Sequence, residues 1–115
     1  MTKYETTFIL EPGFDETRVN NEIDKVSQWI QDLGGEVVEV QRWGKRRMSY
    51  EIRKKRDGIY TWVLWNGGAE MVRELERRLH LNESVMRWLS VLHVEPELTR
   101  GNEAALATAD SDSDD

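Results

Sequence analysis

Residues 36–65 read EVVEVQRWGKRRMSYEIRKKRDGIYTWVLW, and most of the fold can be predicted from this stretch. Two runs rich in β-branched and aromatic residues, 36–52 and 59–65, are joined through the polar segment RKKRDG. The dipeptide Asp57-Gly58 in that segment is typical of a tight hairpin turn. We therefore expect two antiparallel strands that are neighbours in one sheet, with the turn at Asp57-Gly58.

Helical periodicity lies on both sides of this hairpin. Before it, apolar residues recur at alternating spacings of four and three between Asp15, a candidate N-cap, and Gly34-Gly35, a typical helix end. After it, a second helix is predicted over 69–80, and further strands are predicted at 4–10 and 85–94. The order β-α-β-β-α-β with right-handed crossovers predicts an α+β, ferredoxin-like fold: a four-stranded antiparallel sheet with two helices on one face.

The alternation of side chains predicts which strand positions lie under the helices. Even positions are the more apolar in 4–10, and we assign Tyr60 and Trp62 to the core by the same parity, with Leu64. The open face of the sheet would then show one aromatic side chain, Trp65. The strand 36–52 breaks the rule at Gly44, so either a β-bulge resets its phase or it projects beyond the helices. Both alternatives place arginines at a free edge.

Half of the basic side chains lie between Arg42 and Arg56, where eight of them stand against Glu51 alone, although the whole chain has a formal net charge of −6. Lysine and arginine gain affinity for polyanions by displacing counterions from phosphates, whereas a cluster of like charges on an ordinary surface repels itself. We therefore expect this segment to bind a polyanion. Trp43 within it either anchors a protein or RNA interface or packs across the hairpin.

The chain divides into residues 1–98, long enough for one domain with a single core, and residues 99–115. The second part has one leucine, no aromatic residue and four aspartates near its end. Such a composition cannot bury enough apolar surface to offset the entropy of ordering, which predicts a disordered acidic tail. This tail is a solvating segment, a mobile acidic arm or a target of modification.

Catalytic and metal-binding chemistry is not predicted. There is no cysteine, and His80 and His93 have no ligand spacing and no nucleophile motif near them. We expect no catalytic residue, metal, cofactor or small-molecule substrate. Neither a signal peptide nor an apolar run of about 18 residues is present, so we expect a cytoplasmic protein without a membrane segment.

The same topology also occurs in proteins with other functions. Acylphosphatases hold a phosphate in the loop after the first strand, but here that loop begins with Glu11, which repels phosphate. RNA-recognition motifs stack bases on aromatic residues of the two central strands, which the core assignment of Tyr60 and Trp62 disfavours. A stand-alone RNA-recognition protein and a ligand-binding regulatory module remain the alternatives. An apolar open face suggests a protein partner, unless its apolar residues are merely scattered.

Several motifs together resemble the family of bacterial small-subunit ribosomal protein six, over residues 2–96. They are Tyr4-Glu5, EPGFDE at 11–16, Gly34-Gly35, WGKRRMSYEI at 43–52, Gly58-Ile59-Tyr60 and Glu95-Pro96. Met48 and Ser49 stand where the family usually has leucine and alanine, and Glu51 stands at a common proline.

This resemblance implies a non-enzymatic constituent of the small ribosomal subunit in the cytoplasm. It implies binding to the central domain of small-subunit ribosomal RNA, as a heterodimer with ribosomal protein eighteen that aids platform assembly. Arg42, Lys45, Arg46 and Arg47 would make the main phosphate or partner contacts. The candidate binding residues are these four with Trp43, with Lys54, Lys55 and Arg56 for sequence-independent attraction, and with Lys3 and Arg87 as weaker candidates.

Overall fold

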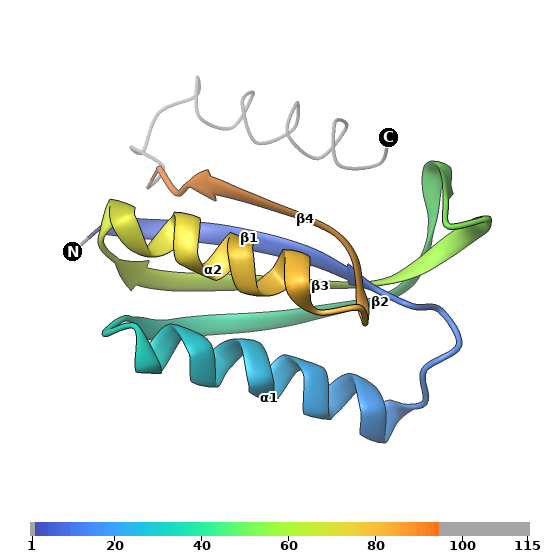
Figure 1. Ribbon diagram of the computed structural model, residues 1–115, viewed down its shortest axis with the longest axis horizontal. Helices are drawn as coiled ribbons and strands as arrows, with labels where there is room; N and C mark the ends of the chain where they lie inside the picture. The colour runs from blue at the N-terminus through green and yellow to red at the C-terminus, as the bar shows by residue number, and fades with distance from the viewer. Residues whose placement is uncertain (1, 95–115) are drawn as a thin grey trace, which may run out of the picture.

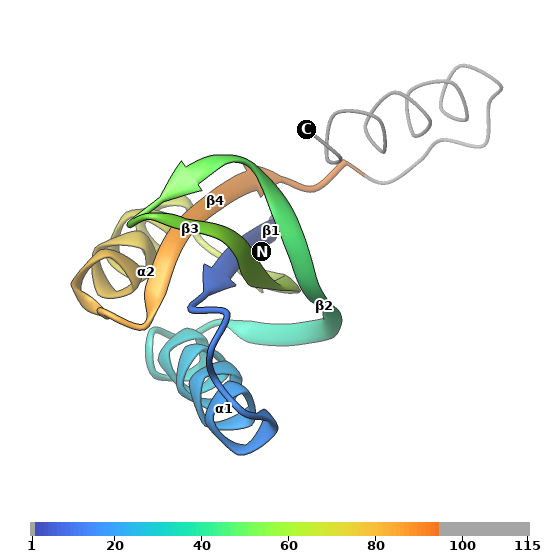
Figure 2. The same cartoon turned by 90° about the vertical axis from the view of Figure 1, so that its right-hand side faces the viewer.

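The computed structural model describes residues 2–94 and has the predicted order of elements. Its strands and helices are β1 (Thr2–Leu10), α1 (Glu16–Asp32), β2 (Glu36–Ile52), β3 (Lys55–Gly67), α2 (Ala69–Leu81) and β4 (Val85–Leu92). The sheet order is β2-β3-β1-β4 with antiparallel neighbours, and both helices cover one face (Figures 1 and 2). The ferredoxin-like prediction is confirmed, whereas the predicted tail, 99–115, lies outside the described residues.

The ends of α1 are set by the residues that the sequence indicated. A side-chain oxygen of Asp15 accepts a hydrogen bond from the backbone N–H of Arg18 at 2.8 Å, which caps the N-terminus. At the other end Gly34 adopts a φ of 95°, a conformation that favours glycine. The chain then turns into β2.

The main core lies between the helices and the sheet. Phe8, Leu10, Val63 and Trp65 of the sheet are fully buried there, against apolar residues of both helices. The indole N–H of Trp65 donates to the hydroxyl of Thr6 at 2.9 Å. This hydrogen bond satisfies the polar group of the largest fully buried side chain.

The prediction that Tyr60, Trp62 and Leu64 lie under the helices is wrong. Thr7 pairs with Trp62 and Phe8 with Thr61, so even positions of β1 share a face with odd positions of β3. Tyr60, Trp62 and Leu64 therefore lie on the open face, and Trp65 is in the core. Alternation fixes the two faces within one strand, whereas the relative phase of two strands depends on their register.

The hairpin turn lies at Arg53-Lys54 and not at Asp57-Gly58. Arg53 and Lys54 have φ values of 54° and 64°, and Ile52 pairs with Lys55, which is the geometry of a two-residue turn with a primed twist. Arg53 supports this backbone, because its guanidinium donates to Glu11 Oε1 at 3.0 Å and to the carbonyl oxygens of Glu83 and Val85 at 2.7 and 3.1 Å.

Gly58 has a packing role within β3. A Cβ atom at this position would collide with Ile9 Cγ2, whereas one at Gly13 would meet no atom within 4 Å. We expect Gly58→Ala to lower the free energy of unfolding by about 1–3 kcal/mol through overpacking. Urea denaturation measures this loss, and Gly13→Ala is the matched control. Equal midpoints for the two variants would contradict the packing role.

A buried carboxylate ties α1 to the segment between α2 and β4. Glu22 is 2% exposed and accepts hydrogen bonds from Asn82 at 2.8 Å and from Lys25 and Arg18 at 3.2 Å each. Burial by itself would raise the pKa of Glu22, but the hydrogen bonds from Asn82 and Lys25 and the Lys25 charge outweigh it, so that the pKa is lowered from 4.5.

The lowered pKa of Glu22 predicts that the unfolding free energy falls in acid. Since its folded-state pKa lies below the unfolded value, the stabilisation is present above about pH 4.5 and is lost as the pH falls through the folded-state pKa. Glu22→Gln should cost about 1–3 kcal/mol at neutral pH and should flatten the acid limb of a plot of unfolding free energy against pH. An acid limb unchanged in the variant would show that other groups cause the pH dependence.

Candidate nucleic-acid and partner interface

The end of the β2–β3 hairpin projects beyond the helices (Figure 1). Gly44 has a φ of 78°, and the pairing of β2 with β3 shifts register between Arg42 and Gly44, so this glycine forms a β-bulge. Both alternatives proposed for Gly44 are therefore correct. Residues 42–56, called the basic hairpin below, extend from this bulge to the turn and back, at the edge of the sheet.

The bulge and the pleat divide the predicted arginine cluster between two faces. Arg46 lies over the ring of Trp43, 5.2 Å from its centroid, on the open face of the sheet. Its charge acts on Tyr60 of the same face, although burial is stronger and raises the pKa of that phenol. Lys45 and Arg47 pair with Ile59 and Asp57 and project from the opposite face. The sequence predicts the same role for Arg46 and Arg47, but Arg46 lies on the open face and Arg47 projects from the opposite face.

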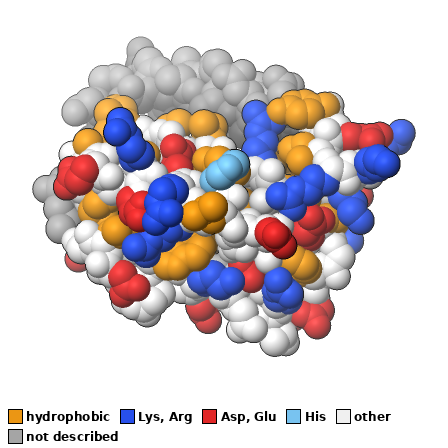
Figure 3. Space-filling view, in the orientation of Figure 1, with side chains coloured by type: hydrophobic (Ala, Val, Ile, Leu, Met, Phe, Trp, Pro, Cys, Tyr) orange, Lys and Arg blue, Asp and Glu red, His pale blue; other side chains and the backbone are white. Residues whose placement is uncertain are grey.

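Members of the basic hairpin differ in how far they are already neutralised. Arg53 is committed to the turn, and Arg56 pairs with Glu51 at 3.5 Å. Five others are exposed and form no ion pair with any residue in the range 2–94; they are Arg42, Lys45, Arg47, Lys54 and Lys55. Figure 3 shows Lys and Arg side chains gathered at the end where the hairpin projects. These cations are available to a polyanion.

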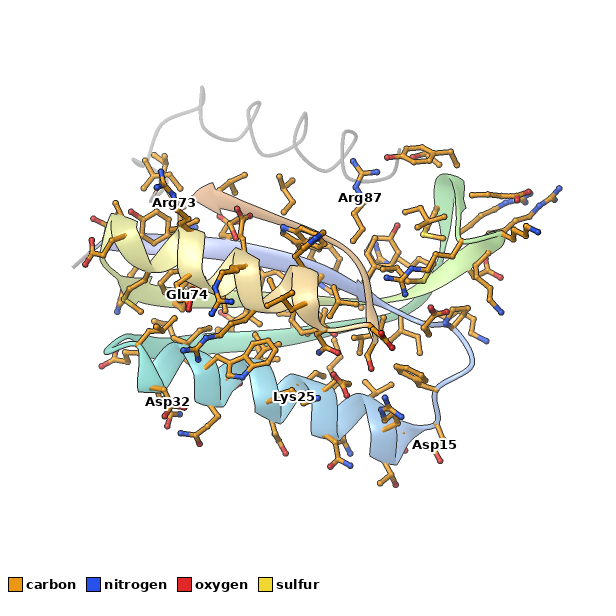
Figure 4. All side chains as sticks on the ribbon, in the orientation of Figure 1. Asp15, Lys25, Asp32, Arg73, Glu74 and Arg87 are labelled. Carbon is orange, nitrogen blue, oxygen red and sulfur yellow. The ribbon has the colours of Figure 1, made fainter. Side chains whose placement is uncertain are left out.

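Of the two weaker candidates, the structure brings one to the hairpin. The guanidinium of Arg87, on β4, lies 5.1 Å from the ring centroid of Tyr50 on β2 (Figure 4). Lys3 pairs with Asn66 at the opposite end of β1, and its carbonyl oxygen accepts the backbone N–H of His93. It therefore lies away from the basic hairpin.

The open face of the sheet carries a groove of about 560 Å³, called the open-face groove below. Tyr50, Leu89 and Val91 in its lining are 56%, 62% and 45% exposed. All four strands contribute apolar or aromatic side chains to it, among them Ile9, Trp43, Met48, Tyr50, Tyr60, Trp62, Leu89 and Val91. This groove is not predicted from the sequence, because the wrong phase of β3 leads to an expected open face with a single aromatic residue. In the sequence, Tyr50 stands out only as part of a family motif.

Two tryptophans of the groove have their indole N–H groups satisfied within the sheet. Trp43 donates to Gln41 Oε1 at 3.0 Å, and Trp62 donates to Glu5 Oε1 at 3.0 Å. The other oxygen of Glu5 lies 2.6 Å from His93 Nδ1. The rings therefore offer apolar surface to a partner, while their N–H groups are already hydrogen-bonded within the sheet.

A second, small hydrophobic cluster holds the basic hairpin against the sheet. It consists of Ile9, Met48 and Met86, each 7% exposed, with Ile52 and Tyr60 packed against them. This cluster fixes the hairpin beside the open-face groove. The groove therefore adjoins the basic hairpin, while Lys45 and Arg47 project from the other face.

Residues 2–94 contain no group of three or more His, Cys, Asp or Glu side chains placed to hold a metal ion. Neither helix of this range is long and apolar enough to cross a membrane.

Comparison with known proteins connects this chain to one family. Residues 3–91 match the family described as Ribosomal protein S6. The small ribosomal subunit protein bS6 of Trichlorobacter lovleyi is 46% identical over 98 residues, which cover 84% of this chain and 80% of the relative. The bS6 protein of Synechocystis sp. is 38% identical over 95% of this chain and 96% of its own length. The crystal structure of 30S ribosomal protein S6 from Thermotoga maritima superimposes with a TM-score of 0.76 at 25% identity and covers 95% of this chain and 97% of that one.

Proposed function

The chain belongs to the ribosomal protein S6 family, and from this premise we propose that it binds the central domain of small-subunit ribosomal RNA as a heterodimer with ribosomal protein eighteen. Its role is that of a structural constituent of the small ribosomal subunit, as the names of its relatives indicate. The family is one of structural ribosomal proteins, and these names describe no enzyme.

The array of basic side chains on the hairpin is the observation that carries the RNA part of the proposal. Five exposed cations project there without a carboxylate partner among residues 2–94. Phosphate contacts of this kind position a protein on RNA without reading bases. Lys45, Arg47 and Lys54 are the residues we assign to the RNA backbone, with Arg42 and Lys55 beside them.

The open-face groove supports the protein partner. Leu89 and Val91 expose apolar surface on β4, and Tyr50 faces them from the hairpin beside Arg87. Apolar and aromatic side chains of this kind, rimmed by polar ones, are typical of protein interfaces. A basic partner bound here would add positive charge next to the basic hairpin, which explains why heterodimer formation should precede tight RNA binding by a chain of net charge −6.

The test measures affinity for a central-domain RNA fragment, with and without ribosomal protein eighteen, across a salt series. We expect weak, salt-sensitive binding by the isolated chain and at least about a tenfold gain with the partner, a coupling of about 1.4 kcal/mol. An RNA duplex of equal length and unrelated sequence is the control. Equal affinities with and without the partner would overturn the proposal.

The position of Tyr60 and Trp62 favours one alternative, a stand-alone protein that stacks single-stranded RNA on its sheet. Both residues lie on β3, one of the two central strands, and line the open-face groove. Each stacked base would contribute about 1–3 kcal/mol. Quenching of tryptophan fluorescence by short single strands, in the absence of any partner, would favour this alternative over the heterodimer.

A further inference from the structure

We propose that the aspartate-rich segment 110–115 of this chain docks on its own basic hairpin and competes there with RNA. Asp110, Asp112, Asp114 and Asp115 are the proposed contacts, and the exposed lysines and arginines of the hairpin receive them. The competition rests on the proposed function, whereas the contact itself can be measured without RNA.

Charge is distributed in a way that directs this segment to the hairpin. Residues 95–115 hold seven carboxylates and one arginine, a net charge of −6, which equals the charge of the whole chain. Residues 2–94 hold 15 acidic and 15 basic side chains and are neutral. Because the basic hairpin is +7, the remainder of 2–94 is −7. The acidic segment is therefore repelled by most of the domain and attracted by one part of it.

Four of the seven basic side chains elsewhere in residues 2–94 are poor competitors for the segment, because each already pairs with a carboxylate. Arg18 and Lys25 both pair with Glu22, and Arg77 and Arg78 both pair with Glu74, at 2.7–3.7 Å. A groove of about 640 Å³ between the two helices is lined by three of these four cations, which are therefore already neutralised. On the hairpin, by contrast, Lys54 and Lys55 stand at the turn with no ion pair among residues 2–94.

The length of chain after the described residues is sufficient for the contact. β4 ends at Leu92 opposite Tyr4, which also lies opposite Trp65 of β3. From Trp65 to Lys55 the strand spans about 33 Å at about 3.3 Å per residue. The 15 residues from 95 to 109 span up to about 50 Å when extended. Asp110 can thus reach the hairpin turn with slack.

The contact between the acidic segment and the basic hairpin is expected to be weak enough for RNA to displace it. Each exposed ion pair is weak by itself, but attachment to the same chain raises the effective concentration to about the millimolar range. RNA, with its closely spaced phosphates, displaces the segment at far lower concentrations than isolated anions do. The acidic segment would thereby suppress binding to non-cognate RNA more than binding to a site that the partner also recognises.

The first experiment compares amide chemical shifts of the full chain with those of a variant carrying Asp→Asn at positions 110, 112, 114 and 115. At about 10 mM salt, where the Debye length is about 30 Å, we expect shift changes concentrated in residues 42–56 and largest near Lys54 and Lys55. At about 1 M salt they should vanish. Ser111→Ala with Ser113→Ala is the matched control and should leave the hairpin unchanged. Identical spectra, or changes spread over α1 and α2, would overturn the contact.

The second experiment measures affinity for a non-cognate RNA duplex at low salt. We expect the asparagine variant to bind about tenfold more tightly than the unaltered chain, and the serine-to-alanine control to bind as the unaltered chain does. Hairpin shift changes with equal RNA affinities would overturn the competition. If no variant binds any RNA, with or without ribosomal protein eighteen, the proposed function fails, while the shift experiment still decides the contact.

Discussion

Replacing Lys45, Arg47, Lys54 and Lys55 together with glutamine is expected to weaken RNA binding by the heterodimer by roughly a hundred- to a thousand-fold at about 0.1 M salt. Each phosphate that a side chain no longer neutralises keeps its counterion, so a plot of log affinity against log salt should become shallower by about one for every such phosphate. Filter binding across a salt series measures both quantities. The change in slope therefore shows whether the lost affinity comes from lost phosphate contacts.

These four side chains form no ion pair among residues 2–94, so the substitutions should change the unfolding free energy by no more than about 0.5 kcal/mol per site. Arg73→Gln on α2 is the control, because it also removes exposed positive charge but lies outside the hairpin. A control that loses as much affinity per charge would mean that the field of the whole molecule attracts RNA and that the hairpin has no special role.

Leu89→Asp is expected to weaken heterodimer formation by at least about 2 kcal/mol, or roughly thirtyfold, because the bound partner would bury a carboxylate without a partner group in the lining of the open-face groove. Leu89 is 62% exposed in the isolated chain, so the substitution should leave its fold intact. Isothermal titration calorimetry with ribosomal protein eighteen measures the loss.

The chain offers a closely matched control for this prediction. Leu81, at the end of α2, is 63% exposed and lies outside the open-face groove. Leu81→Asp should therefore leave heterodimer affinity within about twofold of that of the unaltered chain. If the two variants lose affinity equally, the partner does not occupy the sheet face, and the helix face would be the place to search.

The helices and the element order follow from local chemistry, but the phase of β3 does not. α1 has a capping aspartate at Asp15 and glycines at its end, and these act within a few residues of themselves. β3 lies in the middle of the sheet, with helices on one side and the groove on the other. Both of its phases are therefore apolar, and only pairing with residues some fifty positions away, such as Phe8 with Thr61, decides which one is the core.

The error in the turn has a related cause. An Asp-Gly pair indicates a turn because glycine readily adopts the positive φ that a tight turn requires. Gly58 is needed instead because Ile9 leaves no room for a side chain, and this neighbour is remote in sequence. The turn at Arg53-Lys54 is held by hydrogen bonds from Arg53 to the backbone carbonyls of Glu83, just before β4, and Val85, its first residue, and no local pattern reveals them.

For the candidate site, composition was sufficient to locate the basic segment but not to divide it. Counting charges treats Arg46, Arg47 and Arg53 alike, yet one packs on Trp43, one projects freely from the other face and one secures the turn. The bulge at Gly44 produces part of this division. The open-face groove collects side chains from all four strands and could be found only once their register was known.

The position of β1 has a consequence for how the chain acquires its fold. β1 is the first strand, and it pairs with β3 on one side and with β4, the last strand, on the other, so that Phe8 meets Trp88. Pairing β1 with β4 closes a loop of most of the domain, and this closure costs conformational entropy before the strand contacts offset it. During synthesis β1 therefore keeps an unpaired edge until residue 92 has emerged. We therefore expect the pairing of β1 with β4, which joins the two ends of the domain, to be the last step of folding.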